Sequence, residues 1–481
     1  MLRLKVFIFF LLLTTYPAIA QKQGNIWYFG FGAGMDFNQA PPQALTNGQL
    51  VTNEGCATIC DENGNLLFYT DGIKVWNRFH EIMPNGTQLY GDPSATQSAV
   101  IVPYPGNSNL FYIFTVDNNL GVNGFAYSLV DLTKDSNKGD VIQKNIPMFT
   151  PTTEKITAVK HQNGTDVWVI AKPWNNNEFH TYKITTQGLN PNPIVSYAGL
   201  IHNGFTFNTH GYLKASALGN KLAVAIGTDG ICQLFDFDNE TGLVSNPVTL
   251  GNLLYAYGVE FSPDGSKLYI SRRYHPDIYQ YDITSNDETT IRRSLSVIPT
   301  RYNIGALQLA PDGKIYCSKY GYALDIINNP DGKGNTALYQ ADGADLAGRT
   351  ASLGLPTFVQ SFFNTIAFTY GNNCKGQTTT FSLIDDTDVL ETLWDFGDPA
   401  SGGANVSTNR NPTHLYQSAG TYTVKLTITY TDGTQRVFER FIVIATGPPV
   451  VDLGPDKTLC DETVLLDASD SSTLGTKFIV S

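Results

Sequence analysis

The 481-residue sequence predicts an all-β protein: a seven-bladed β-propeller, an Ig-like β-sandwich and the start of a further Ig-like domain. A strand–turn–strand pattern with Pro-Asp-Gly at its turn occupies residues 259–271 and returns at 307–317. Proline fixes φ and glycine accepts positive φ, so this tripeptide is a strong turn signal. Looser copies precede both stretches at intervals of roughly 40–60 residues, a period typical of propeller blades. The six turn glycines are Gly64, Gly106, Gly164, Gly219, Gly265 and Gly313.

The two ends of the predicted propeller indicate how its ring closes. Residues 24–29, GNIWYF, match the turn and second strand at 64–69, GNLLFY, which places a seventh turn at Gly24. The inner strand of that blade would fall inside the export signal, and a blade without it would leave an open edge. We therefore predict that Phe358–Phe363 pairs beside Ile26–Phe29, which completes seven blades over residues 21–368.

After the propeller the pattern changes to that of a compact sandwich, predicted over residues 369–446. The stretch 419–433 alternates apolar and polar residues, as a half-buried strand does. Tyr422 and the glycine two residues before it resemble a tyrosine corner, in which the phenol bonds back to the backbone. We expect Trp394 and Tyr422 to be buried. Residues 447–481 are predicted to be a linker and the truncated start of another Ig-like domain, because a sandwich needs ~100 residues.

Residues 1–20 have the features of a secretory signal peptide. Arg3 and Lys5 form its basic end, residues 6–13 its apolar core, and Ala18-Ile19-Ala20 its cleavage site. No cysteine follows the cleavage site, which argues against a lipoprotein, and no other stretch is long enough to span a bilayer. The sequence thus predicts export through the inner membrane.

Six cysteines in an exported chain raise the question of disulfides. Cys56 and Cys60 would lie ~13 Å apart on one predicted strand, which is too far for a bridge. Cys232 and Cys317 fall in non-adjacent predicted blades, so we expect all four thiols to be free. Cys460 is also predicted to be unpaired.

Charge and motifs narrow the possible partners. The formal net charge is −12 and no stretch is rich in Lys or Arg, which argues against nucleic acid and against anionic membrane surfaces. No HExxH, GxSxG or P-loop motif is present, so we predict no catalytic residue, no metal and no cofactor. The Asp-rich turn at 236–242 lacks the spacing of an EF-hand and is interpreted as a hairpin turn.

Alignment on the turn glycines brings out one set of polar residues. Five positions before the glycine, three predicted inner strands carry apolar residues and the next three carry Lys214, Glu260 and Gln308. Inner strands line the central channel of a propeller, where ligands often bind. The three residues therefore form either a ligand pocket or a structural polar network. We favour the network, in which Lys214 pairs with Glu260, because a buried charge must be paired.

A second set of polar residues stands just before the predicted inner strands, near the channel mouth. These residues are the better candidates for contact with a ligand. They are Glu54, Gln97, Glu154 and Lys155.

Several stretches resemble known families. LWDFGDP (393–399), THLY (413–416) and GTYTVKLTI (420–428) resemble a PKD domain. EGCAT (54–58), YGVEFSPDG (257–265), LQLAPDGKIY (307–316) and other stretches resemble the N-terminal propeller region of exported Bacteroidetes proteins. Those proteins end in a type B sorting domain for type IX secretion, also called the gliding-motility-associated C-terminal domain, and no such domain is present here. The resemblance implies that the protein is secreted or lies on the outer-membrane surface, with the type IX machinery as a partner if the full-length protein carries a sorting domain.

The sequence leads to a functional hypothesis with two alternatives. The hypothesis is an exported binding or adhesion protein whose propeller recognises an extracellular glycan or protein and whose PKD and Ig-like domains act as spacers. The first alternative is a glycan-active propeller enzyme, a polysaccharide lyase or hydrolase, which would need acid–base groups converging at the channel mouth. The second is a structural component of the cell surface.

Overall fold

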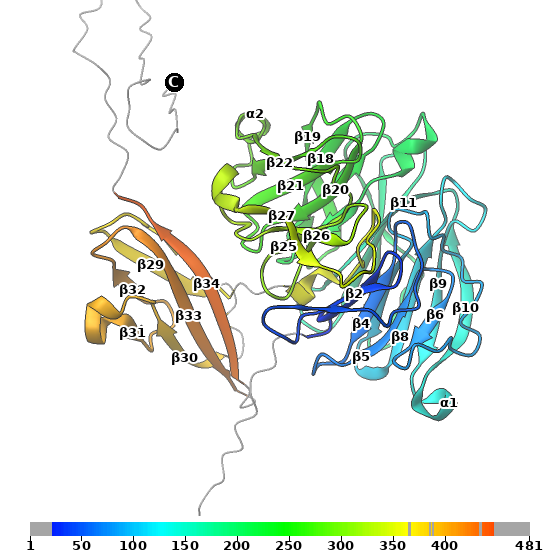
Figure 1. Ribbon diagram of the computed structural model, residues 1–481, viewed down its shortest axis with the longest axis horizontal. Helices are drawn as coiled ribbons and strands as arrows, with labels where there is room; N and C mark the ends of the chain where they lie inside the picture. The colour runs from blue at the N-terminus through cyan, green and yellow to red at the C-terminus, as the bar shows by residue number, and fades with distance from the viewer. Residues whose placement is uncertain (1–21, 364–366, 384–385, 387–388, 432–434, 447–481) are drawn as a thin grey trace, which may run out of the picture. The chain divides into compact units, whose positions relative to one another are not determined.

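The computed structural model describes residues 22–363, 367–383, 386, 389–431 and 435–446. The predicted signal peptide, the predicted domain start at 447–481 and Cys460 lie outside these residues. The chain divides after residue 365 into two compact units, which are described separately below. In both units, most of the regular secondary structure is β-strand (Figure 1).

The described residues of the first unit form seven antiparallel sheets of three to five strands that follow one another along the chain (Figure 1). The first sheet consists of β1 (Ile26–Phe29), β2 (Ala33–Asp36) and β3 (Gln43–Leu45). The second consists of β4 (Ala57–Cys60), β5 (Leu66–Thr70) and β6 (Val75–Asn77). The third consists of β7 (Ala99–Tyr104), β8 (Asn107–Val116), β9 (Phe125–Asp131) and β10 (Asp140–Phe149). The fourth consists of β11 (Thr152–Lys160), β12 (Val167–Pro173), β13 (Glu178–Thr185), β14 (Gly188–Leu189) and β15 (Ile194–Tyr197). The fifth sheet consists of β16 (Leu213–Ala215), β17 (Lys221–Ile226), β18 (Ile231–Asp238) and β19 (Leu243–Leu250). The sixth consists of β20 (Ala256–Phe261), β21 (Lys267–Arg272), β22 (Asp277–Asp282) and β23 (Ser296–Pro299). The seventh consists of β24 (Leu307–Leu309), β25 (Ile315–Cys317), β26 (Ala323–Ile327) and β27 (Tyr339–Asp345).

The six predicted turn glycines all adopt left-handed backbone angles, with φ between 69° and 87°. Each lies between the first and second strand of its sheet, where a residue with a Cβ would be strained. The turn chemistry was therefore correctly predicted from the sequence. Gly24, the proposed seventh member, does not have a positive φ.

The first strands of consecutive sheets are neighbours. From β4 onward, β7, β11, β16, β20 and β24 each contact the first strand of the sheet before. These strands are almost wholly buried. Between β24 and β4 lies Leu353, whose carbonyl accepts a hydrogen bond from Ala306 N (2.7 Å) and whose amide donates to Asn53 O (3.0 Å).

The prediction that Phe358–Phe363 pairs as a strand beside β1 is wrong. Residues Gln360–Phe363 form the short 3-10 helix η3, and the preceding residues make only isolated parallel bridges, to Cys56 and Ala158. Aromatic rings replace the expected ladder: Phe358 packs 5.8 Å from Trp27 and 5.1 Å from Phe363. The segment therefore does lie against β1, but through side chains.

The second unit is a sandwich of two antiparallel sheets around one hydrophobic core. One sheet consists of β28 (Phe368–Gly371), β29 (Thr378–Leu383) and β32 (Thr413–Leu415), and the other of β31 (Val406–Ser407), β30 (Val389–Asp395), β33 (Gly420–Tyr430) and β34 (Gln435–Ile444). Trp394 is fully buried between them, as predicted, and its indole donates to Asn409 O (2.8 Å). Tyr422 is only partly buried, because its hydroxyl reaches out to the Ser418 carbonyl (2.9 Å), the backbone contact expected of a tyrosine corner.

Helices are few and short in the described residues. They are α1 (Lys134–Asn137), α2 (Glu288–Arg293) and the 3-10 helices η1 (Thr206–Thr209), η2 (Gly334–Ala337), η3 and η4 (Pro399–Asn405). In this part of the chain, no helix combines the length and the apolar character needed to cross a membrane.

Trp394 provides a test of the sandwich core. We expect Trp394→Ala to lower the free energy of unfolding of an isolated 366–446 fragment by about 3–5 kcal/mol, since a large buried side chain is lost. The adjacent Leu393 is 50% exposed, so Leu393→Ala should cost no more than about 1 kcal/mol. Urea unfolding followed by far-UV circular dichroism measures both. Equal losses in the two variants would contradict the assigned core.

Candidate ligand-binding site

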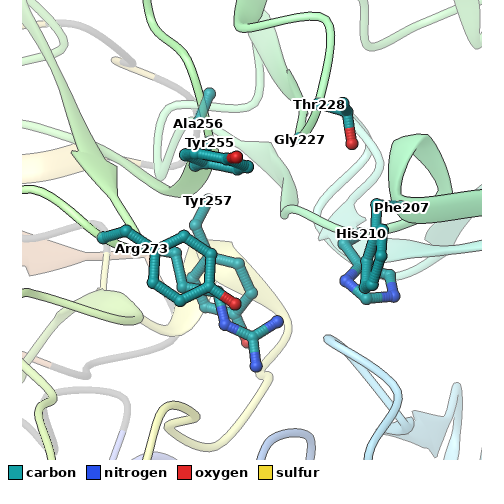
Figure 2. A pocket seen from close by; sticks show the side chains of 9 residues that line it. Phe207, His210, Gly227, Thr228, Tyr255, Ala256, Tyr257 and Arg273 are labelled. Carbon is teal, nitrogen blue, oxygen red and sulfur yellow. The ribbon is translucent and has the colours of Figure 1, made fainter. Parts of the chain in front are cut away.

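A pocket of about 240 Å³ opens in the first unit, between residues that lead into β16 and residues that flank β20 and β21. Figure 2 shows Phe207 and His210 on one side of it and Tyr255, Tyr257 and Arg273 on the other. The residues that line it are Phe207, His210, Gly227, Thr228, Tyr255, Ala256, Tyr257, Arg273 and Tyr274.

Tyr255, which forms part of one wall of the pocket, has a strained backbone conformation. Its φ of 64° is left-handed, which costs an L-residue with a bulky side chain about 1–2 kcal/mol. Two backbone hydrogen bonds fix it: its amide donates to Gly227 O and its carbonyl accepts from Arg273 N, both at 2.9 Å. Its ring stands perpendicular to that of Tyr274 at 4.9 Å. Strain of this kind gathers at functional sites, where the surrounding structure maintains it.

Lys155, one of the sequence candidates, holds the opposite wall from inside the protein. Its ammonium donates to three consecutive carbonyls, those of Asn208 (3.2 Å), Thr209 (2.5 Å) and His210 (2.6 Å). Burial lowers the pKa of Lys155 to about 7, although neighbouring Glu154 opposes the shift. The side chain is fully buried, so it fixes the course of η1 and does not meet a ligand itself.

Glu154, the next sequence candidate, supports the same wall. Its carboxylate accepts hydrogen bonds from the Thr96 amide and hydroxyl (both 2.9 Å), from Asn119 N (3.0 Å) and from the Thr209 hydroxyl (3.2 Å). His210 Nε2 lies 3.3 Å from Glu154 Oε1 and 3.1 Å from Asn119 Oδ1, so this nitrogen carries the proton. Burial lowers the pKa of His210, and its imidazole is therefore neutral at pH 7.

Glu54, the third candidate, supports the wall that carries Arg273. It accepts a hydrogen bond from the Tyr257 hydroxyl (2.9 Å), and its other oxygen lies 3.2 Å from Arg273 Nη2. The guanidinium of Arg273 sits 5.7 Å from the ring centre of Tyr257 and 5.6 Å from that of Tyr274. Burial raises the pKa of Glu54 to about 7, against the opposing charge of Arg273.

Gln97, the fourth candidate, lies just before β7 and connects the third sheet with the fourth and the fifth. Its amide oxygen accepts from Leu213 N (2.8 Å) and Ile156 N (3.3 Å), while its amide nitrogen donates to Leu213 O (3.1 Å). All four candidates are thus turned into the protein, with side chains no more than 2% exposed. Three of them contact the residues that form the pocket walls.

The second predicted set comes together away from the pocket lining. Lys214 donates to Glu260 Oε2 (2.8 Å), Gln308 Oε1 (2.9 Å) and the Leu307 carbonyl (2.8 Å). Glu260 in turn accepts from the backbone amide of Leu309 (2.7 Å). Burial lowers the pKa of Lys214 and raises that of Glu260, and the opposite charge of the partner counteracts both shifts. We infer that these residues form a structural network across three first strands.

Sequence reasoning did not single out the residues that line the pocket. His210 was one of seven scattered histidines, and Arg273 and Tyr274 follow a strand without any recognisable motif. The available signal was the run of two arginines, a tyrosine and a histidine at 272–275. The left-handed conformation of Tyr255 has no sequence signature.

Among the described residues, no group of three or more His, Cys, Asp or Glu side chains is placed to hold a metal ion. Cys56, Cys60, Cys232 and Cys317 are free and buried, as expected from the sequence, and Cys374 is free and partly exposed.

Comparison with known proteins identifies the second unit. A model of the PKD domain family matches residues 366–444. Residues 366–444 are a PKD domain. Over 74 residues the chain is 36% identical to a microbial collagenase of Vibrio alginolyticus, a match that spans 15% of this chain and 8% of the collagenase.

Two solved structures are each similar to a part of this chain. The PKD1 domain of the Vibrio cholerae metalloprotease PrtV is 27% identical and matches 16% of this chain and 95% of its own, with a TM-score of 0.14. A functionally unknown protein of Desulfotomaculum acetoxidans is 14% identical and matches 71% of this chain and 87% of its own, with a TM-score of 0.38. Neither likeness bears on activity.

The ion pair within the network predicts a non-additive effect on stability. Glu260→Ala should cost about 3–5 kcal/mol, because it leaves the buried ammonium of Lys214 without its counter-charge. The double variant with Lys214→Met should be more stable than this single variant. Chemical denaturation of wild type, both single variants and the double variant measures the coupling. Additive losses would contradict the pair.

Glu54 predicts a pH dependence of stability. Its pKa is raised to about 7 in the folded state from about 4.5, so the folded protein binds the proton more tightly than the unfolded chain. Stability from this group is present below pH ~4.5 and is lost as pH rises through ~7. The free energy of unfolding of Glu54→Gln, minus that of wild type, should therefore rise by up to about 3 kcal/mol from pH 5 to pH 8. Denaturation midpoints at the two pH values give this difference, and an unchanged difference would show that Glu54 titrates normally.

Proposed function

We propose that this protein is an exported binding protein in which the first unit recognises an extracellular ligand and the PKD domain acts as a spacer. The pocket between Phe207 and Arg273 is the proposed recognition site. The observation that carries the proposal is the way the pocket is built: its walls expose aromatic rings, and buried charged residues hold these walls in place. A preformed pocket with a few fixed polar groups is the usual form of a ligand site.

We further propose that the seven sheets of the first unit are the blades of a β-propeller. In support, the first strands of six consecutive sheets are neighbours in chain order. The backbone of Leu353 forms hydrogen bonds with Ala306, just before β24, and with Asn53, just before β4, so it connects the two ends of this series. The repeat period of the turn glycines agrees with the same architecture. In such a ring, the loops that form the pocket lie at the end opposite the turn glycines, since they follow the second strands or precede the first strands.

Export is part of this proposal. It is supported by the signal-like features of residues 1–20 and by the resemblance to exported Bacteroidetes proteins. That resemblance also favours type IX secretion and a location on the cell surface or in the medium.

A glycan-active enzyme is the second candidate. It is favoured by Glu54, because a carboxyl group with a pKa of about 7 is suited to general acid–base catalysis. Against it, Glu54 and Glu154 are only 2% and 0% exposed, so in this conformation neither carboxylate reaches a bound substrate.

A glycan array probed with the mature chain tests the proposal. We expect defined hits whose apparent affinity falls at least about tenfold in Phe207→Ala and Tyr274→Ala, since both rings line the pocket. Tyr197→Ala is the matched control, because Tyr197 is 71% exposed on β15 and does not line the pocket. Binding unaffected by the pocket variants would move the site elsewhere, and chromatographic detection of cleaved glycan would favour the enzyme.

A further inference from the structure

We infer that the pocket takes a sugar residue that carries a carboxylate, the uronic acid of an extracellular polysaccharide. This inference rests on the proposed binding function and names the ligand class of the same pocket.

The first argument is the charge that the pocket presents. Among the described residues that line it, Arg273 is the only lysine or arginine, and His210 beside it is neutral. Arg273 is fixed by Glu54 and by the rings of Tyr257 and Tyr274. A guanidinium offers five donors in a planar fork, and the ion pair with Glu54 engages Nη2. A carboxylate is the ligand group that matches the remaining donors in geometry and charge.

The second argument is the position of the acidic groups. Glu54 and Glu154 lie behind the walls, at 2% and 0% exposure, and each already accepts hydrogen bonds from within the protein. A ligand in the pocket therefore contacts the guanidinium and the imidazole directly, but neither carboxylate. Glu54 is already paired with Arg273, so a ligand carboxylate would bind the donors of the guanidinium that Glu54 leaves free.

The third argument is the shape and character of the walls. The rings of Tyr255 and Tyr274 meet at 90°, and Phe207 faces the pocket from the other side with 57% of its surface exposed (Figure 2). The face of an aromatic ring is electron-rich and attracts the polarised C–H bonds that a pyranose ring presents. The volume of about 240 Å³ is below the ~300–1,000 Å³ of sites for drug-sized molecules, which suits one sugar ring.

The fourth argument separates this site from general attraction of polyanions. The chain carries a net charge of −12 and has no basic stretch, so its overall field repels an acidic polysaccharide. Attraction of an acidic sugar to this pocket would thus depend on Arg273, and one substitution there should remove it.

Isothermal titration of the mature chain with oligogalacturonate, oligoglucuronate and oligomannuronate, each as free acid and as methyl ester, tests the inference. The ester keeps the sugar ring and removes the charge. We expect at least one free acid to bind wild type about 10–100-fold more tightly than its ester, the range of one charge-assisted hydrogen-bonding contact. Arg273→Gln should lose that difference and leave ester binding nearly unchanged.

Two further variants distinguish the loss of a binding contact from misfolding of the variant. Arg273→Gln leaves Glu54 buried without its counter-charge, so the double variant Arg273→Gln with Glu54→Gln removes both charges together and should also fail to distinguish acid from ester. Tyr197→Ala should behave as wild type. Equal binding of acid and ester by wild type would overturn the uronic acid and leave the binding function intact. Failure of every free acid to bind, with neutral glycans captured on the array, would also overturn it, whereas an array without any hit would refute glycan recognition as a whole and the uronic acid with it.

Discussion

The first unit depends on one constraint: charged side chains buried among its first strands must find their partners inside the protein. Lys155, Lys214, Glu54, Glu154 and Glu260 are all no more than 2% exposed. An ion without a partner in such surroundings costs several kcal/mol, so each of these groups restricts how its neighbours can be arranged. Because the partners come from other sheets, these charges restrict how the sheets are arranged around them.

The buried charges serve two different ends. Lys214 and Glu260 bind each other and the backbone of β24, which links three consecutive sheets. Lys155 and Glu54, by contrast, bind groups that belong to the pocket walls. The same physical requirement thus yields a rigid interior in one place and a preformed site in another. Preformed walls lower the entropic cost of ligand binding, because fewer side chains have to be ordered when the ligand binds.

Sequence reasoning reached those features that depend on local chemistry. The turn glycines were predictable because positive φ is almost a property of glycine alone, and Lys214 and Glu260 were found because strand register repeats with the turns. The way in which Phe358–Phe363 lies against β1 was not predictable, since the packing of several aromatic rings decides it and no strand pairing forms. The pocket was missed for a related reason: loops far apart in the chain form it, and the conformation of Tyr255 depends on Gly227 and Arg273.

The free thiols of the first unit have a practical and a biological consequence. Cys56, Cys60, Cys232 and Cys317 are buried in three different sheets, and burial raises the pKa of each thiol, so the reactive thiolate is suppressed in the folded protein. Alkylating reagents will reach them when their sheets open, which makes these four residues internal reporters of local unfolding. The same protection lets the unit tolerate an oxidising environment without forming wrong bridges, and no disulfide has to form among these thiols for it to fold.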